Sequence, residues 1–209
     1  MMFRNIFRPD SPLMITMNQI TDCIFLSLFW LLGCFPVITI GTSFSALYDA
    51  VYHTFRRGEK NSWHRFAHAF KQNLKPGILP TVIFLAVSAV LVRCGILVWN
   101  QAVYGNISWG VFAAAAFFLL VLLGLGSILF PLLSRFETGT VQLFSNTIRL
   151  GFANLPLTMG LAMVNAVMIF LCIRYVVPLF FLPALGALLS TLFVEPMLKP
   201  YMPSEDAAE

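Results

Sequence analysis

Residues 100–134 of this chain carry no charged side chain, and 110–133 are apolar almost throughout. A helix that crosses the ~30 Å hydrocarbon core of a bilayer needs about 20 such residues. Of the 209 residues, 59% are hydrophobic and only 11% charged, and the mean hydropathy is +0.84. A soluble domain has about a quarter of its residues charged, and a globule of this size cannot hide so much apolar surface. The sequence therefore predicts a protein embedded in lipid.

Five segments have the length and composition of membrane helices. They are Leu13–Phe35, Ile78–Trp99, Gly110–Leu133, Leu155–Ile173 and Val176–Phe193. The second opens with Pro80 in its first turn, where a missing N–H does no harm. We expect an all-α, polytopic helical bundle in which residues 1–209 form one integral membrane domain.

The basic residues indicate an orientation for these spans. Residues 41–77 carry six of them against Asp49 and Glu59: Arg56, Arg57, Lys60, Arg65, Lys71 and Lys75. Residues 100–109 carry none. The positive-inside rule places 41–77 and 134–154 in the cytoplasm, so five spans put the N-terminus outside and the C-terminus inside. A first segment that turns back near Pro36–Gly41 is the main alternative.

The segment FPVITIGTSFSALYDAVYHTFRRGE, residues 35–59, predicts an elbow after the first span. Pro36 cannot continue the helix and Gly41 permits a sharp turn, so Pro36, Thr39, Gly41, Thr42 and Tyr48 form the elbow motif. Thr42 or Ser43 would then cap a new helix. Apolar stripes at helical spacing predict cytoplasmic interfacial helices over 43–56, 62–73 and 139–152, and a weak internal repeat. Residues of the first two helices give a predicted interaction face: Arg56, Arg57, Trp63, Arg65, Phe66, Phe70 and Lys71.

Four polar or charged residues lie within or beside the predicted spans, where they are costly and mark candidate sites. They are Asp22, Arg93, Asn165 and Arg174. Asp22 and Arg93 have similar predicted depths from the outer surface, so they either pair or face a polar gap and the headgroups separately. Arg93 and Arg174 could meet an acidic sugar or a lipid phosphate, although snorkelling explains both. Asn165 and the small residues of 113–127 favour either internal packing or a docking face for another membrane protein.

Several motifs together resemble the YesL family of small bacterial membrane proteins, a domain of unknown function. They are Pro36-x-x-Thr39-x-Gly41, Ala46–Leu47–Tyr48, Arg57–Gly58–Glu59, the Phe66–Phe70–Lys71–Asn73 segment, FPLLSRFE at 130–137 and NLPLT at 154–158. The resemblance implies a multi-pass protein of the cytoplasmic membrane of Gram-positive bacteria. It also implies a link to carbohydrate-uptake loci, and it supplies no catalytic residue.

The sequence contains no convergent set of acid, base and nucleophile, so no enzymatic activity and no cofactor are expected. His64 and His68 lie four apart on one helix face, but no third ligand follows at a fixed spacing, so no metal site is expected. The first functional hypothesis is an accessory or scaffold subunit bound to membrane lipid and to the permease subunits of a carbohydrate ABC importer, with no nucleic-acid partner. A stand-alone transporter or channel for small solutes is the alternative, and a membrane enzyme ranks third.

Overall fold

The computed structural model describes residues 12–59, 61–105, 108–136 and 139–198, with side chains from residue 17 onward. Every regular element in these ranges is a helix, which confirms the all-α class. The elements are α2 (Pro12–Gly33), the 3₁₀ turn η1 (Val37–Thr39), α3 (Ile40–Val51), the π-helical turn η2 (Tyr52–Arg56), α4 (Ser62–Val103), α5 (Trp109–Arg135), α6 (Thr140–Ala153), α7 (Leu155–Arg174), the 3₁₀ turn η3 (Val177–Phe180) and α8 (Leu182–Leu198).

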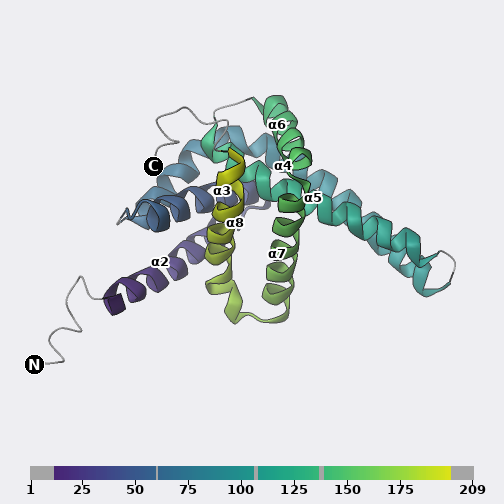
Figure 1. Cartoon of the computed structure of the whole chain (residues 1–209), viewed down its shortest axis with the longest axis horizontal. Helices are drawn as coiled ribbons and strands as arrows, with labels where there is room; N and C mark the ends of the chain where they lie inside the picture. The colour runs from purple at the N-terminus through teal and green to yellow at the C-terminus, as the bar shows by residue number, and fades with distance from the viewer. Residues whose placement is uncertain (1–11, 60, 106–107, 137–138, 199–209) are drawn as a thin grey trace, which may run out of the picture.

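Helix α3 is the centre of the fold, where α2, α4, α5 and α8 all contact it (Figure 1). All of its residues from Gly41 to Val51 are buried except Phe44. Ala46, Leu47, Ala50 and Val51 form one hydrophobic cluster with Leu26 and neighbouring residues. The predicted interfacial helix at 43–56 is therefore wrong in its placement. Protein covers this helix on nearly every side, so it does not lie on the surface of the bundle.

Helix α4 joins two segments that the sequence analysis separates. The predicted cytoplasmic helix 62–73 and the predicted span 78–99 are parts of one helix of 42 residues, with Pro76 and Pro80 inside it. A proline removes one backbone hydrogen bond, but neighbouring helices and hydroxyl side chains can compensate inside a bundle. Helix α3 packs along this stretch, with Gly41 of α3 against Thr81 and with Thr42 of α3 against Gly77. The helix therefore continues through both prolines.

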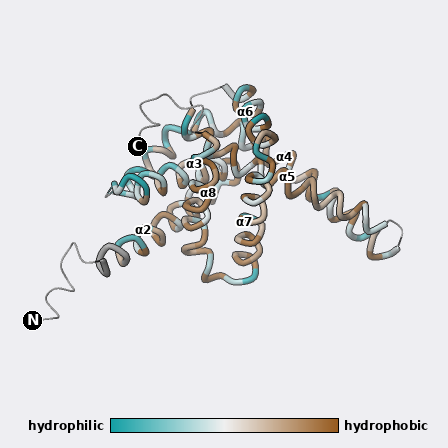
Figure 2. The backbone as a smooth tube through the Cα atoms, in the orientation of Figure 1, coloured by the Kyte–Doolittle hydropathy of each residue, from teal (hydrophilic) through white to brown (hydrophobic). Residues whose placement is uncertain are grey.

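Two helical hairpins extend from the body, one formed by α4 and α5 and one by α7 and α8 (Figure 1). Most of the projecting part of each is hydrophobic (Figure 2). At the tip of the first hairpin, Trp109 packs edge to face against Trp99 and Phe112. Tryptophan is enriched where membrane helices reach the headgroups, so this tip has the composition of a membrane interface.

Three helices in the described part of the chain are long and apolar enough to cross a membrane, namely α4, α5 and α7. The predicted count of five spans is not confirmed. The predicted fifth span begins at Val176, but residues 177–180 form a separate 3₁₀ turn and α8 starts only at Leu182, which leaves it 17 residues. Helix α2 contributes the shorter apolar stretch Met17–Gly33.

Candidate functional site

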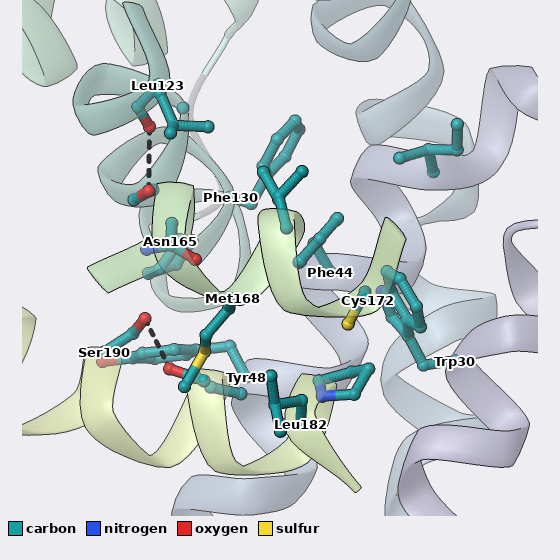
Figure 3. A pocket seen from close by; sticks show the side chains of 18 of the residues that line it. Trp30, Phe44, Tyr48, Leu123, Phe130, Asn165, Met168, Cys172, Leu182 and Ser190 are labelled. Carbon is teal, nitrogen blue, oxygen red and sulfur yellow. Dashed lines mark hydrogen bonds between the residues drawn. The ribbon is translucent and has the colours of Figure 1, made fainter. Parts of the chain in front are cut away.

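A cavity of about 300 Å³ lies between α3, α5, α7 and α8, with further wall residues from α2 and α4. Its walls are almost wholly apolar. Figure 3 shows Trp30, Phe44, Phe130, Met168 and Cys172 around it. Ile40, Phe44 and Tyr48 recur every four residues on α3 and form one side. The cavity is thus a hydrophobic space with few polar wall residues, Tyr48 and Asn165 among them.

Tyr48 connects this cavity to a buried ion pair. Its hydroxyl donates to Glu195 Oε1 at 2.8 Å, and Arg135 Nη2 donates to the same oxygen at 2.8 Å. The side chains of Arg135 and Glu195 are only 15% and 14% exposed. The Arg135 guanidinium also lies 3.8 Å from the ring centroid of Tyr52. Burial, followed by the carboxylate of Glu195, raises the pKa of Tyr48 well above its ordinary value, so this phenol stays protonated and donates.

A second charge cluster lies around the end of α3. Arg65 Nε donates to Asp49 Oδ2 at 2.8 Å, and Arg65 Nη2 donates to His53 Nε2 at 2.7 Å. An arginine has no acceptor, so Nε2 must accept and we assign the His53 proton to Nδ1. That N–H then donates to Glu59 Oε1 at 2.8 Å. This hydrogen bond is the main cause of the lowered pKa of Glu59, and the charge of Arg65 adds to it. The cluster ties α3 to the start of α4.

The turn after α3 brings Glu59 back to His53. Residues Tyr52–Arg56 form a π-helical turn, and Gly58 follows with φ +70°. Glycine adopts this left-handed conformation without a side-chain penalty. The Glu59 N–H then donates to the His53 carbonyl at 3.1 Å. The Arg57–Gly58–Glu59 motif therefore closes the charge cluster.

The elbow motif is present, but its parts act differently from the prediction. Thr39 is buried and donates its hydroxyl to the carbonyls of Gly33 and Pro36, each at 2.7 Å. Helix α3 begins at Ile40, so Thr42 and Ser43 lie inside it and neither caps it. Gly41 lies against Thr81 and Phe130, where a Cβ would clash with both. The elbow is therefore a packed junction between α2, α3, α4 and α5.

The predicted interaction face is divided by the fold. Arg56, Arg57, Trp63 and Lys71 are exposed. Phe66 is only 5% exposed and stacks on the half-buried Phe70 with ring centroids 6.1 Å apart. Arg65 belongs to the charge cluster described above. The surface that remains available is smaller and more basic than the sequence indicates.

Of the two alternatives for Asp22 and Arg93, the structure contradicts pairing. Asp22 Oδ1 accepts a hydrogen bond from the Ser62 hydroxyl at 2.7 Å, at the first residue of α4. Arg93 lies 31 residues further along that helix, roughly 46 Å at 1.5 Å per residue, and its side chain is exposed. The prediction placed the start of the first span at the outer surface, level with the end of the second span. In the structure, Asp22 of α2 lies instead beside the start of α4.

Of the other two flagged residues, one lies in the cavity wall and the other directly follows a wall residue. Asn165 is in the wall and donates Nδ2 to the Leu161 carbonyl at 2.8 Å. Arg174 is exposed and follows Ile173, which is also a wall residue.

The small residues of α5 serve two environments. Gly124 packs against Thr158 and Ala162 of α7, and Gly126 packs against Phe84 of α4. Gly110, Ala113 and Ala114 are instead exposed.

His64 and His68 are exposed as well, and in the described ranges no three His, Cys, Asp or Glu side chains gather as a metal site.

Neither charge cluster was predicted from the sequence, neither the pair of Arg135 with Glu195 nor the cluster of Asp49, His53 and Glu59 with Arg65. A usable signal existed for the pair. In a chain with so few charges, Arg135 and Glu195 each stand at the end of a long apolar segment and have opposite signs. Such charges need a partner if they are buried. The signal gives no partner for either, since 60 residues separate them.

Comparison with curated proteins and with solved structures gave no match. One family model matches part of the chain, from Cys23 in α2 to Arg93 in α4. This region contains the elbow, all of α3 and the charge cluster at its end. The match is consistent with the YesL-type resemblance. Residues 23–93 of the chain are thus similar to the family described as "Protein of unknown function, DUF624".

Proposed function

We propose that this protein is a non-catalytic accessory subunit that packs against other membrane proteins, with permease subunits of a carbohydrate ABC importer as the expected partner. The use of its charges supports a structural role. Asp49 pairs with Arg65, and Glu195 pairs with Arg135. Both pairs join helices of the body to one another. The importer itself is an expectation from the YesL resemblance.

The observation that carries the proposal is the projecting α4–α5 hairpin. Many of its apolar side chains on both helices are exposed, for example Val90 at 62%, Leu97 at 54% and Phe118 at 62%. Gly110, Ala113 and Ala114 form an exposed small-residue patch on α5. Small residues let another helix backbone approach closely in lipid. The hairpin therefore offers a surface on which a partner helix can pack.

Affinity purification in a mild detergent tests this proposal. We expect the tagged protein to recover importer permeases, and Ala114→Leu to reduce that recovery because leucine keeps a partner helix away from the patch. Ala89→Leu is the matched control, since Ala89 is an exposed alanine on α4 outside the patch. Recovery of the chain alone, or equal recovery with both variants, would contradict the docking role of this patch.

The cavity is the observation that favours the alternative, a stand-alone transporter. A path for a sugar needs several hydrogen-bonding groups near the membrane midplane. Here Tyr48 is already engaged with Glu195, and Asn165, Ser127 and Ser190 each bond a backbone carbonyl of their own helix. An apolar cavity of this kind suits a hydrophobic molecule, so sugar flux in vesicles containing the pure protein is not expected.

We also propose a revised orientation in which the chain begins on the cytoplasmic side. Asp22 is hydrogen-bonded to Ser62 at the start of α4, and Asp49 near the end of α3 is paired with Arg65. Helices α2 and α3 therefore leave this end and return to it, as in the re-entrant alternative. If the basic segment 41–77 is cytoplasmic, the start of α2 is cytoplasmic too.

Reporter fusions test this orientation. A reporter fused before residue 12 that fluoresces only in the cytoplasm should be active, and the same reporter inserted in the α4–α5 turn should be inactive. A cytoplasmic signal from the turn together with none from the N-terminus would reverse the proposal.

A further inference from the structure

We propose that the cavity holds one acyl chain of a membrane phospholipid, with the lipid phosphate at Arg174. This site is independent of the accessory role proposed above. It follows from the chemistry of the cavity walls, the dimensions of the cavity, the surface around its mouth and the position of one arginine.

The walls and the volume fit a hydrocarbon chain. Aromatic and aliphatic side chains such as Phe44, Phe84 and Ile169 make up almost all of the lining. Apolar cavities of this kind stay dry, and one of about 150 Å³ is known to bind benzene. The cavity here has about 300 Å³, so it has room for roughly a dozen carbon atoms. Water would be poorly held in it because the wall offers few hydrogen-bond partners.

The depth of the cavity corresponds to one leaflet. Its wall includes Asn165 and Ile173 on α7, and Leu182 and Ser190 on α8. Each pair is eight residues apart, which is about 12 Å along a helix. Half of a hydrocarbon core of ~30 Å is about 15 Å. A chain that enters at the level of Ile173 and Leu182 can thus extend toward Tyr48 over most of one leaflet.

The mouth of the cavity opens on an apolar surface. Ile173 is 81% exposed and Ile169 is 48% exposed, although both belong to the wall. Val176 and Val177, just beyond, are 71% and 70% exposed. Helix α7 is one of the helices able to cross a membrane. In a bilayer the medium at this mouth is lipid hydrocarbon, so phospholipid chains are the most concentrated candidates for entry.

Two polar groups can recognise the rest of the lipid. Arg174 is exposed, directly follows the mouth residue Ile173, and has its guanidinium 6.0 Å from the Tyr175 ring centroid. Arginine pairs well with phosphate oxygens. In the cavity wall, the buried indole Nε1 of Trp30 has no hydrogen-bond partner. A buried donor without a partner is costly, and an ester carbonyl of the lipid can accept from it.

Tryptophan fluorescence tests occupancy directly. Trp63, Trp99 and Trp109 are replaced by phenylalanine so that Trp30 is the one emitting tryptophan. This protein is reconstituted in phosphatidylglycerol vesicles with brominated or unmodified acyl chains. We expect bromine to quench Trp30, and Cys172→Phe, which fills the cavity, to abolish the quenching. Val167→Phe is the matched control, because Val167 lies on the exposed side of α7. Absent quenching, or equal quenching in both variants, overturns the site.

Native mass spectrometry of the detergent-purified protein tests the identity of the ligand. We expect one bound phospholipid, retained in Val167→Phe and lost in Cys172→Phe. Arg174→Gln should lower the bound fraction, whereas Arg93→Gln, at an exposed arginine away from the cavity, should leave it unchanged. A bound fatty acid without a phosphate, no bound lipid, or equal loss in the two arginine variants would overturn the phospholipid assignment. If Cys172→Phe does not fold, the comparison of bound phospholipid between Arg174→Gln and Arg93→Gln remains the test.

Discussion

Replacing Gly41 by alanine is expected to destabilise the protein by about 1–3 kcal/mol, with valine at the same position costing more. A Cβ on Gly41 would clash with Thr81 Oγ1 and with the ring of Phe130. Thr81 is fully buried and bonds the Gly77 carbonyl, and Phe130 is only 8% exposed. The Phe130 ring also stacks on Phe44 at 6.0 Å. Neither neighbour can move without disturbing α3 or α4.

Gly160→Ala is the matched control for this prediction. Gly160 lies in α7, and a Cβ there meets nothing within 4 Å. In a helix, alanine in place of glycine gains roughly 0.5–1 kcal/mol through backbone entropy. Thermal unfolding in detergent, followed by circular dichroism, should separate the two variants by several degrees. If Gly41→Ala unfolds at the same temperature as Gly160→Ala, α3 does not pack at the elbow in this way.

The break after α2 could be predicted from the sequence, because Pro36 leaves a clear local signal. The predicted turn at Gly41 is wrong, since Gly41 lies inside α3 and instead allows close packing against Thr81 and Phe130. The burial of α3 could not be predicted. Its apolar residues at helical spacing are equally expected of an interfacial helix with one face in lipid. The residues on its other side, Thr42, Ser43 and Ser45, are polar in composition but small, and all three are fully buried. A Cβ on Gly33 would contact Ser43, and a Cβ on Gly77 would contact Thr42. These hydroxyl-bearing residues serve close helix packing.

The prediction of two separate helices within α4 is wrong for a related reason. Pro76 and Pro80 interrupt a helix in water, and the prediction placed a boundary there. Inside a bundle a helix can continue through proline because neighbouring helices offset the lost hydrogen bonds, and here α3 packs along this stretch. The candidate site was partly visible in Tyr48, Asn165 and Arg174. The cavity itself depends on which faces of α7 and α8 meet α3. No local sequence pattern encodes how helices that are far apart in the chain pack together.

The Arg135–Glu195 pair gives the second large expected effect. Removing one member of a mostly buried ion pair typically costs 3–5 kcal/mol, because the other charge remains without its partner. Among the residues that the structure describes, Arg135→Met leaves the carboxylate of Glu195 with the Tyr48 hydroxyl as its one side-chain donor. It also removes the contact with the Tyr52 ring. We expect a loss of about 3 kcal/mol in the free energy of unfolding for this single variant. Tyr48→Phe removes one hydrogen bond but keeps the ion pair, so it should cost only about 1 kcal/mol.

The double variant Arg135→Met/Glu195→Gln distinguishes an ion pair from simple packing. With no charge left to bury, it should be more stable than Arg135→Met alone, since the neutral amide oxygen still accepts from Tyr48. A double-mutant cycle on unfolding in detergent measures this coupling. If the two losses add, the groups do not interact in the membrane protein. A recovery, in contrast, means that this charge pair joins the C-terminal end of α5 to that of α8 through α3. The same connection holds Tyr48 in the cavity wall, so these variants should alter lipid retention together with stability.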